Sequence, residues 1–169
     1  WLSANTLPGV PPVLQDQLVL PYQLGRDFAR AVWARGGWDA LRQAWEPDPR
    51  LDEITIGHLL SMQAGLGSTS GARYGSWVSS RNWVRSALAQ PFEDEPGGRM
   101  IYSTGSTHLL SAILTRQSGR STLQLAREWL GPLDGFAIAS WERDPQGIYL
   151  GGNLMAMSPR SLLAFGELY

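Results

Sequence analysis

The chain has 169 residues, enough for one compact domain, and 43% of them are hydrophobic, which is sufficient to bury a core. Its 14 basic and 15 acidic residues give a net charge of -1, so charge offers no reason to expect nucleic acid or an anionic membrane as a partner. No apolar run approaches the roughly 18 to 20 residues of a membrane span. The absence of cysteine excludes disulfides, thiolate catalysis and zinc–thiolate sites.

Every basic residue is an arginine, and the sequence contains no lysine. Arginine keeps its charge at any working pH and serves poorly as a proton acceptor. A mechanism that needs a lysine base or a Schiff base is therefore not available from these residues alone.

The first part of the chain, residues 1–48, is predicted to be a proline-rich lead-in followed by a helical segment of uncertain origin. Residues 1–22 hold four prolines and favour extended backbone with at most one short helix, around residues 13–20. Helical spacing predicts a helix over residues 24–35 that Gly36 and Gly37 end, and a second short helix over residues 38–45. The prolines at 47 and 49 mark the best candidate boundary in the chain.

The second part, residues 49–169, is expected to be mostly helical. Thr55 is a plausible N-cap for a helix through Gln63, residues 65–75 are predicted to be a loop, and residues 80–90 a further helix. The clearest helix covers residues 105–118, with Gly119 just after its end.

Ser121 is predicted to cap a helix over residues 122–130, in which Trp129 would pack inward. Residues 138–141 and 147–150 are expected to be short strands or loops, and Ser158-Pro159 is typical of the start of a last helix. No internal repeat or alternating strand–helix pattern occurs, so the fold class is predominantly α.

Four stretches of this second part, in order, resemble the serine β-lactamase and penicillin-recognising hydrolases, of the class C type. They are residues 54–66 (ITIGHLLSMQAGL), 96–103 (PGGRMIYS), 107–121 (THLLSAILTRQSGRS) and 151–166 (GGNLMAMSPRSLLAFG). The resemblance covers about residues 50–169 and implies the helical lobe of that family's α/β fold, with most of the sheet missing. It also implies a periplasmic or other extracytoplasmic location.

In that family, a serine three residues before a lysine attacks an amide, ester or lactam carbonyl, and the lysine and a tyrosine act as the base. The resemblance places Tyr102 at the base position and Thr104 where asparagine is usual. Ser106 lies close by as a substitute for that asparagine, and Gly151 and Gly152 correspond to a glycine turn beside the substrate. These five residues are the candidate site. No cofactor and no metal are expected.

The remaining parts of that mechanism are absent from the chain. Ser70 and Arg73 have the spacing of the serine–lysine motif but lie in a Gly/Ser loop with arginine in place of lysine, and no Lys-Thr-Gly or His-x-Gly occurs. A phenol without a neighbouring cation is a poor base at neutral pH.

Two functions follow from these residues. One is part of a serine hydrolase that acts on a small-molecule amide, ester or lactam and is inactive as this chain alone, with a partner chain supplying the rest of the fold. The alternative is a non-catalytic binding or structural subunit of a larger assembly.

Residues 20–38 are also similar to a short segment of uncharacterised metallopeptidase-like proteins, but no His-Glu-x-x-His motif accompanies them. His58 and His108, the two histidines, each precede a Leu-Leu pair and are expected to have structural roles. The eight tryptophans are expected mainly to pack in the core. The alternative is that some of them line a substrate groove or contact a partner chain.

Overall fold

The computed structural model describes residues 24–39 and 46–168. The chain divides into two units between Asp48 and Pro49, and each unit is described by itself. The expectations for residues 1–22, and most of the expected helix over residues 38–45, fall outside the described residues.

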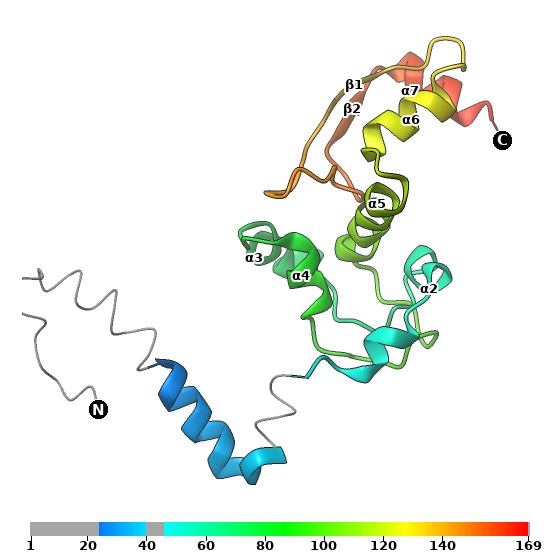
Figure 1. Ribbon diagram of the computed structural model, residues 1–169. Coiled ribbons are helices and arrows are strands. Elements are labelled where there is room, and N and C mark those ends of the chain that lie inside the picture. The colour runs from blue at the N-terminus through cyan, green and yellow to red at the C-terminus, as the bar shows by residue number, and fades with distance from the viewer. Residues whose placement is uncertain (1–23, 40–45, 169) are drawn as a thin grey trace, which may run out of the picture. The chain divides into compact units, whose positions relative to one another are not determined.

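In the first unit, residues 24–39 form one helix (Figure 1). The helical segment extends to residue 39, four residues beyond the predicted end, but Gly37 has the left-handed φ of 60° with which a glycine interrupts a regular helix. The apolar side chains are largely exposed, and Trp33 and Trp38 meet edge to face at 4.9 Å between ring centroids.

The second unit is a small helical lobe with one two-stranded sheet (Figure 1). Its elements are η1 (Pro49–Glu53), α2 (Ile56–Leu60), η2 (Gly71–Arg73), α3 (Tyr74–Val78), α4 (Trp83–Leu88), α5 (Thr104–Ser118), α6 (Thr122–Leu130), β1 (Ile138–Trp141), β2 (Met155–Met157) and α7 (Pro159–Gly166). The predominantly α fold class is confirmed.

Helix α5 is the centre of this lobe, because α2, α4 and α6 all contact it. One buried cluster joins α2, α4 and α5 through Leu59, Ala87 and Leu109. A second cluster packs Trp77 and Trp83 against Leu150, which lies in the segment between the two strands. The two clusters flank α5, so its position is set by side chains from across the lobe.

The sheet pairs β1 and β2 as antiparallel strands, with Ile138 opposite Met157 and Trp141 opposite Met155. A bulge interrupts the register between Ile138 and Ser140. β1 matches one of the predicted short strands, whereas β2 was not predicted. Residues 147–150 form a loop, held by an isolated bridge between Arg143 and Tyr149.

Several helix boundaries match the caps that the sequence predicted. Thr55 caps α2, Ser121 caps α6 and Ser158 caps α7, each accepting a backbone N–H three residues ahead. Gly119 ends α5 in the left-handed conformation, with φ of 67°.

Other boundaries differ from the prediction. α2 ends at Leu60 instead of Gln63, because Met62 turns the chain with φ of 59°. α3 starts at Tyr74, inside the expected loop, and α4 is shorter than predicted because Asn82 caps it. The expectation that Trp129 packs inward is wrong, since its side chain is 59% exposed.

Candidate functional site

The candidate site lies at the N-terminus of α5, where the chain passes from extended backbone into the helix. Ser103 is the N-cap residue by backbone conformation, with φ of -148° and ψ of 119°, but its side chain makes no cap hydrogen bond. Its hydroxyl instead accepts the backbone N–H of Thr69 at 3.1 Å. The cap of α5 must therefore come from elsewhere in the chain.

The segment Ser68–Ser70, here called the hydroxyl strap, supplies that cap. Ser70 Oγ accepts the backbone N–H of Thr104 at 2.8 Å, and Thr69 Oγ1 accepts that of Gly105 at 2.8 Å. These are two of the N–H groups that the first turn of a helix leaves without a partner. The strap, more than 30 residues away in sequence, thus satisfies the end of α5.

Gly105 explains why the strap can approach so closely. A Cβ at this position would lie 2.8 Å from Thr69 Oγ1 and 3.0 Å from the Cβ of Ala87. Any larger residue would push the strap or α4 away from α5. The glycine therefore allows the strap, α4 and the first turn of α5 to meet.

Tyr102 is attached to the same strap, yet its side chain faces solvent. Its carbonyl accepts the hydroxyl of Ser68 at 2.6 Å, and its side chain is 62% exposed. The backbone of Tyr102 is thus held at the helix N-terminus while the phenol remains accessible. This arrangement suits a group that meets a substrate or a second protein segment.

Thr104 and Ser106 differ from Tyr102, because both are buried. The Thr104 hydroxyl lies 2.8 Å from Ser70 Oγ, and either oxygen can be the donor. Ser106 lies within the first turn of α5, where its N–H donates to the carbonyl of Ser103. Ser70 therefore acts as a cap for α5 in this structure, with its oxygen already engaged twice.

Gly151 and Gly152 lie in the segment between β1 and β2 and pack on the first turns of α5. A Cβ on Gly151 would collide with the backbone carbonyl of Thr107, and one on Gly152 would meet the Thr104 methyl group and lie 2.8 Å from Thr107 Oγ1. The structure thus brings Thr104, Gly151 and Gly152 together and leaves Tyr102 exposed at the same end of the helix.

Two residues near this turn had no role in the sequence analysis. The Tyr74 hydroxyl donates to Asn153 Oδ1 at 3.3 Å, joining α3 to the glycine turn. Asn153 stands in the Gly-Gly-Asn stretch of the family resemblance, whereas Tyr74 was placed inside the predicted loop over residues 65–75 and nothing local pointed to it.

Both histidines have the structural roles that the sequence indicated. His58 Nδ1 accepts the N–H of Thr55 at 3.4 Å and completes a capping box on α2. His108 is fully buried, with Nε2 3.1 Å from Asp144 Oδ2. Burial lowers the pKa of His108 below its ordinary value, and the hydrogen bond and charge of Asp144 oppose that shift.

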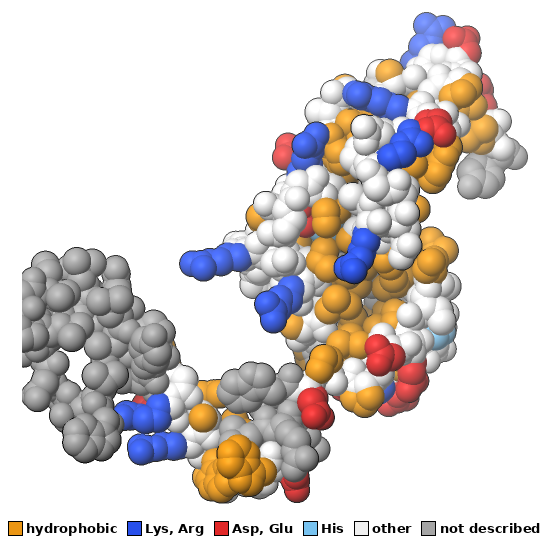
Figure 2. Space-filling model, viewed as in Figure 1, with side chains coloured by type: hydrophobic (Ala, Val, Ile, Leu, Met, Phe, Trp, Pro, Cys, Tyr) orange, Lys and Arg blue, Asp and Glu red, His pale blue; other side chains and the backbone are white. Residues whose placement is uncertain are grey.

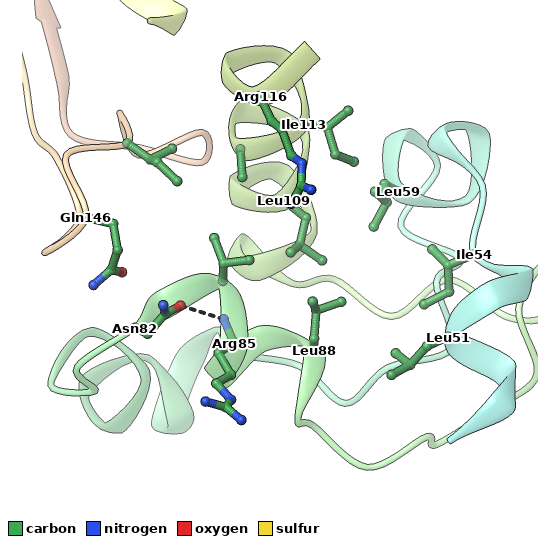
Figure 3. A pocket seen from close by; sticks show the side chains of 13 residues that line it. Leu51, Ile54, Leu59, Asn82, Arg85, Leu88, Leu109, Ile113, Arg116 and Gln146 are labelled. Carbon is green, nitrogen blue, oxygen red and sulfur yellow. Dashed lines mark hydrogen bonds between the residues drawn. The ribbon is translucent and has the colours of Figure 1, made fainter. Parts of the chain in front are cut away.

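An apolar pocket of about 550 Å³ lies on a different side of α5, between η1, α2 and α4 (Figure 3). Leu51, Leu59 and Leu109 are among its lining residues, with Arg85 and Arg116 also contributing. None of the five candidate residues lines it. Hydrophobic side chains gather on this face of the second unit over α2, α4 and α5 (Figure 2).

Within residues 24–39 and 46–168, no three histidine, aspartate or glutamate side chains are grouped so that they could hold a metal ion. None of the helices in the same residues is long and apolar enough to cross a membrane.

The fold and site define a helical lobe whose longest helix presents a phenol at its strapped N-terminus. The family model named Beta-lactamase matches residues 24–166, and the chain therefore belongs to the Beta-lactamase family. The match begins at residue 24, so it takes in the helix over residues 24–39, which lies upstream of the resemblance seen from residue 50 onward. The chain has no match among curated proteins.

Proposed function

We propose that this lobe supplies the tyrosine base and one wall of a serine acyl-transfer site, with the serine nucleophile and the amine contributed by residues outside this sequence. The substrate class is a small-molecule amide, ester or β-lactam. Membership of the Beta-lactamase family supports the reaction class. The absence of lysine from the sequence is the reason for placing the nucleophile and amine elsewhere.

The observation that carries this proposal is the exposed phenol of Tyr102 on a fixed backbone. The strap holds its carbonyl through Ser68, and the side chain is 62% exposed at the N-terminus of α5. In the proposed reaction, the serine oxygen bonds to the carbonyl carbon as its proton passes to the base. The same proton then goes to the leaving amine or alcohol, and water releases the acyl group.

Thr104 and the Gly151–Gly152 turn are proposed as the neighbouring wall. A Cβ on Gly152 would meet the Thr104 methyl group and one on Gly151 the Thr107 carbonyl, so both glycines are needed for the turn to lie against α5. Ser106 is proposed only as a buried support of this wall, because its side chain is not exposed.

Covalent labelling tests the proposal. A fluorophosphonate and a fluorescent penicillin are incubated with the 169-residue chain and with the full-length product of its gene, and intact masses are measured. We expect the full-length product to be acylated and the 169-residue chain to remain unlabelled. Labelling of the 169-residue chain, or of neither protein, would overturn the proposal.

Tyr102→Phe in the full-length product isolates the phenol. General-base catalysis is worth about 10²- to 10⁴-fold, so labelling should slow by at least about 100-fold. Trp129→Phe is the control, because Trp129 is an exposed aromatic residue on α6 and is none of the candidate site residues. Equal labelling rates for both variants would contradict the role of Tyr102.

A second function, a non-catalytic binding or structural subunit, is favoured by the hydroxyl network. Thr104 stands where asparagine is usual, and its hydroxyl is engaged with Ser70. An orienting amide is therefore replaced by a group turned toward the strap. The absence of acylation in the full-length product would support this function over the first.

A further inference from the structure

Behind the candidate site, a buried histidine–aspartate pair connects α5 to the segment between the two strands. His108 lies on the second turn of α5, and Asp144 follows β1 by three residues. Both side chains are completely inaccessible, and Nε2 of the histidine lies 3.1 Å from Oδ2 of the aspartate. A buried polar pair that joins segments 36 residues apart is costly to separate.

Asp144 also organises its own turn. Its Oδ1 accepts the backbone N–H of Gln146 at 2.9 Å and that of Ile148 at 2.8 Å. The backbone N–H of Asp144 donates to the Ile148 carbonyl at 2.8 Å. An ionised carboxylate only accepts hydrogen bonds, so His108 must carry its proton on Nε2. Its Nδ1 then has no hydrogen-bond partner among the described residues.

The turn made by Asp144 leads directly to the two glycines of the candidate site. Ser111 donates from α5 to the Tyr149 carbonyl at 2.6 Å, and Leu150 is fully buried. From there, Gly151 and Gly152 reach the first turns of α5. Since Thr104 and His108 are four residues apart on α5, they lie on the same face of the helix.

We infer that the His108–Asp144 pair is a positioning element that holds the Gly151–Gly152 turn against Thr104. Any effect of the pair on catalysis rests on the proposed acyl-transfer function. The positioning of the glycine turn does not depend on that function. The pair acts as one anchor, and the 148–152 segment extends from it to the site. Removing the hydrogen bond should therefore loosen the glycine turn while α5 and α6 stay folded.

The groups around His108 favour a neutral ring. The rings of Trp77 and Trp83 face it edge on, each at 5.7 Å between centroids, and neither indole titrates. Asp144 is the charged group that acts on it. On the same segment, Arg143 stacks over the Tyr149 ring and Glu142 is exposed. A second proton, on Nδ1, would be buried without an acceptor. Protonation of His108 would therefore destabilise the packing that holds the pair in place.

Amide hydrogen exchange on the 169-residue chain tests the inference. In His108→Leu, the amides of Gln146, Ile148 and Leu150 should exchange about tenfold or more faster, with unchanged protection in α6. The Overhauser contact between the Gly152 α protons and the Thr104 methyl group should weaken. Uniform loss of protection, or none in these three amides, would overturn the inference.

Rescue by a conservative variant separates positioning from simple packing. His108→Gln keeps an N–H donor that can reach Asp144 and should retain most of the protection that His108→Leu loses. Glu142→Gln, an exposed change in the same segment, should behave as the unchanged chain. Equal losses in the Gln and Leu variants would show that the hydrogen bond is not the cause.

A measurement on the unchanged chain covers the case in which the variants fail to fold. The ¹⁵N shifts of the His108 ring should show a proton on Nε2 and a bare Nδ1. The opposite tautomer would overturn the inference. Because none of these readouts needs acylation, they succeed or fail independently of the labelling experiment.

Discussion

Helices α5 and α6 follow one another in the chain but begin in different ways. α6 is capped within its own first turn, where Ser121 and Gln124 exchange hydrogen bonds with each other's backbone. α5 is capped by Ser70 and Thr69, which lie more than 30 residues away. A local cap can form in an isolated segment, whereas a distant cap exists only once the lobe has folded.

The two helices also differ in burial: α5, with its distant cap, is more deeply buried than α6, with its local cap. The first turns of α5 bury Thr104, Ser106 and His108, so a polar face is directed inward. α6 buries only Leu125 and leaves Trp129 exposed. The candidate site thus occupies the end of the lobe that depends most on tertiary contacts.

The largest expected effect comes from Gly151→Ala. The added methyl would collide with the backbone of Thr107 on α5, which cannot move without displacing the helix. We expect the free energy of unfolding to fall by about 3 kcal/mol, the upper part of the usual range for overpacking. Urea unfolding measures it. Gly75→Ala, with open space around it in α3, is the control and should leave stability the same or raise it by up to about 1 kcal/mol.

Thr69→Val tests the distant cap of α5. It removes the hydroxyl that accepts the Gly105 N–H and leaves that group buried without a partner. The expected loss is about 2 kcal/mol in the free energy of unfolding, measured in urea. Thr69→Ser keeps the hydroxyl and should stay near the unchanged chain. A Val variant as stable as the Ser variant would show that the strap does not hold α5.

The pH dependence of stability tests the buried histidine. Burial lowers the pKa of His108 from its ordinary 6.5, so the unfolded chain takes up this proton at a higher pH than the folded one. Stability should therefore be full above pH 6.5 and fall as the pH drops below it, by at most about 1.4 kcal/mol per pH unit. Urea unfolding at pH 7.5 and 5.5 measures this. His108→Gln should flatten the dependence, and an unaltered slope would assign it to other groups.

Ser121→Ala gives the smallest expected change, because it removes an exposed local cap. The Ser121 hydroxyl accepts the Gln124 N–H at the solvent-facing start of α6. We expect a loss of about 1 kcal/mol in the free energy of unfolding, measured by the same urea titration. A loss larger than that of Thr69→Val would reverse the comparison between the two helices.

Local chemistry accounts for the parts of the fold that the sequence predicted well. Ser121, Ser158 and Thr55 were assigned as caps, and Gly119 as the end of α5, because each acts within four residues of its partner. The family resemblance rested on stretches of the same kind, in the right order. It placed Tyr102 before α5, the longest helix of the second unit, where the structure also has it.

The features of the fold that the sequence did not predict depend on contacts between distant residues. The end of α2 at Leu60 follows from the turn at Met62, whose carbonyl accepts the Ile101 N–H from far along the chain. β2 is three residues long and is a strand only because β1 pairs with it. Asp144 carried no local pattern that would link it to His108.

The sequence by itself determined the helical class, the family and the place of Tyr102 in the chain, because periodicity, caps and ordered motifs are properties of neighbouring residues. Only the tertiary structure decided that Ser70 caps α5, that Thr104 and Ser106 are buried, and that His108 pairs with Asp144. The physical reason is that a hydroxyl or a carboxylate can satisfy many partners, and burial selects one of them only when distant segments have come together.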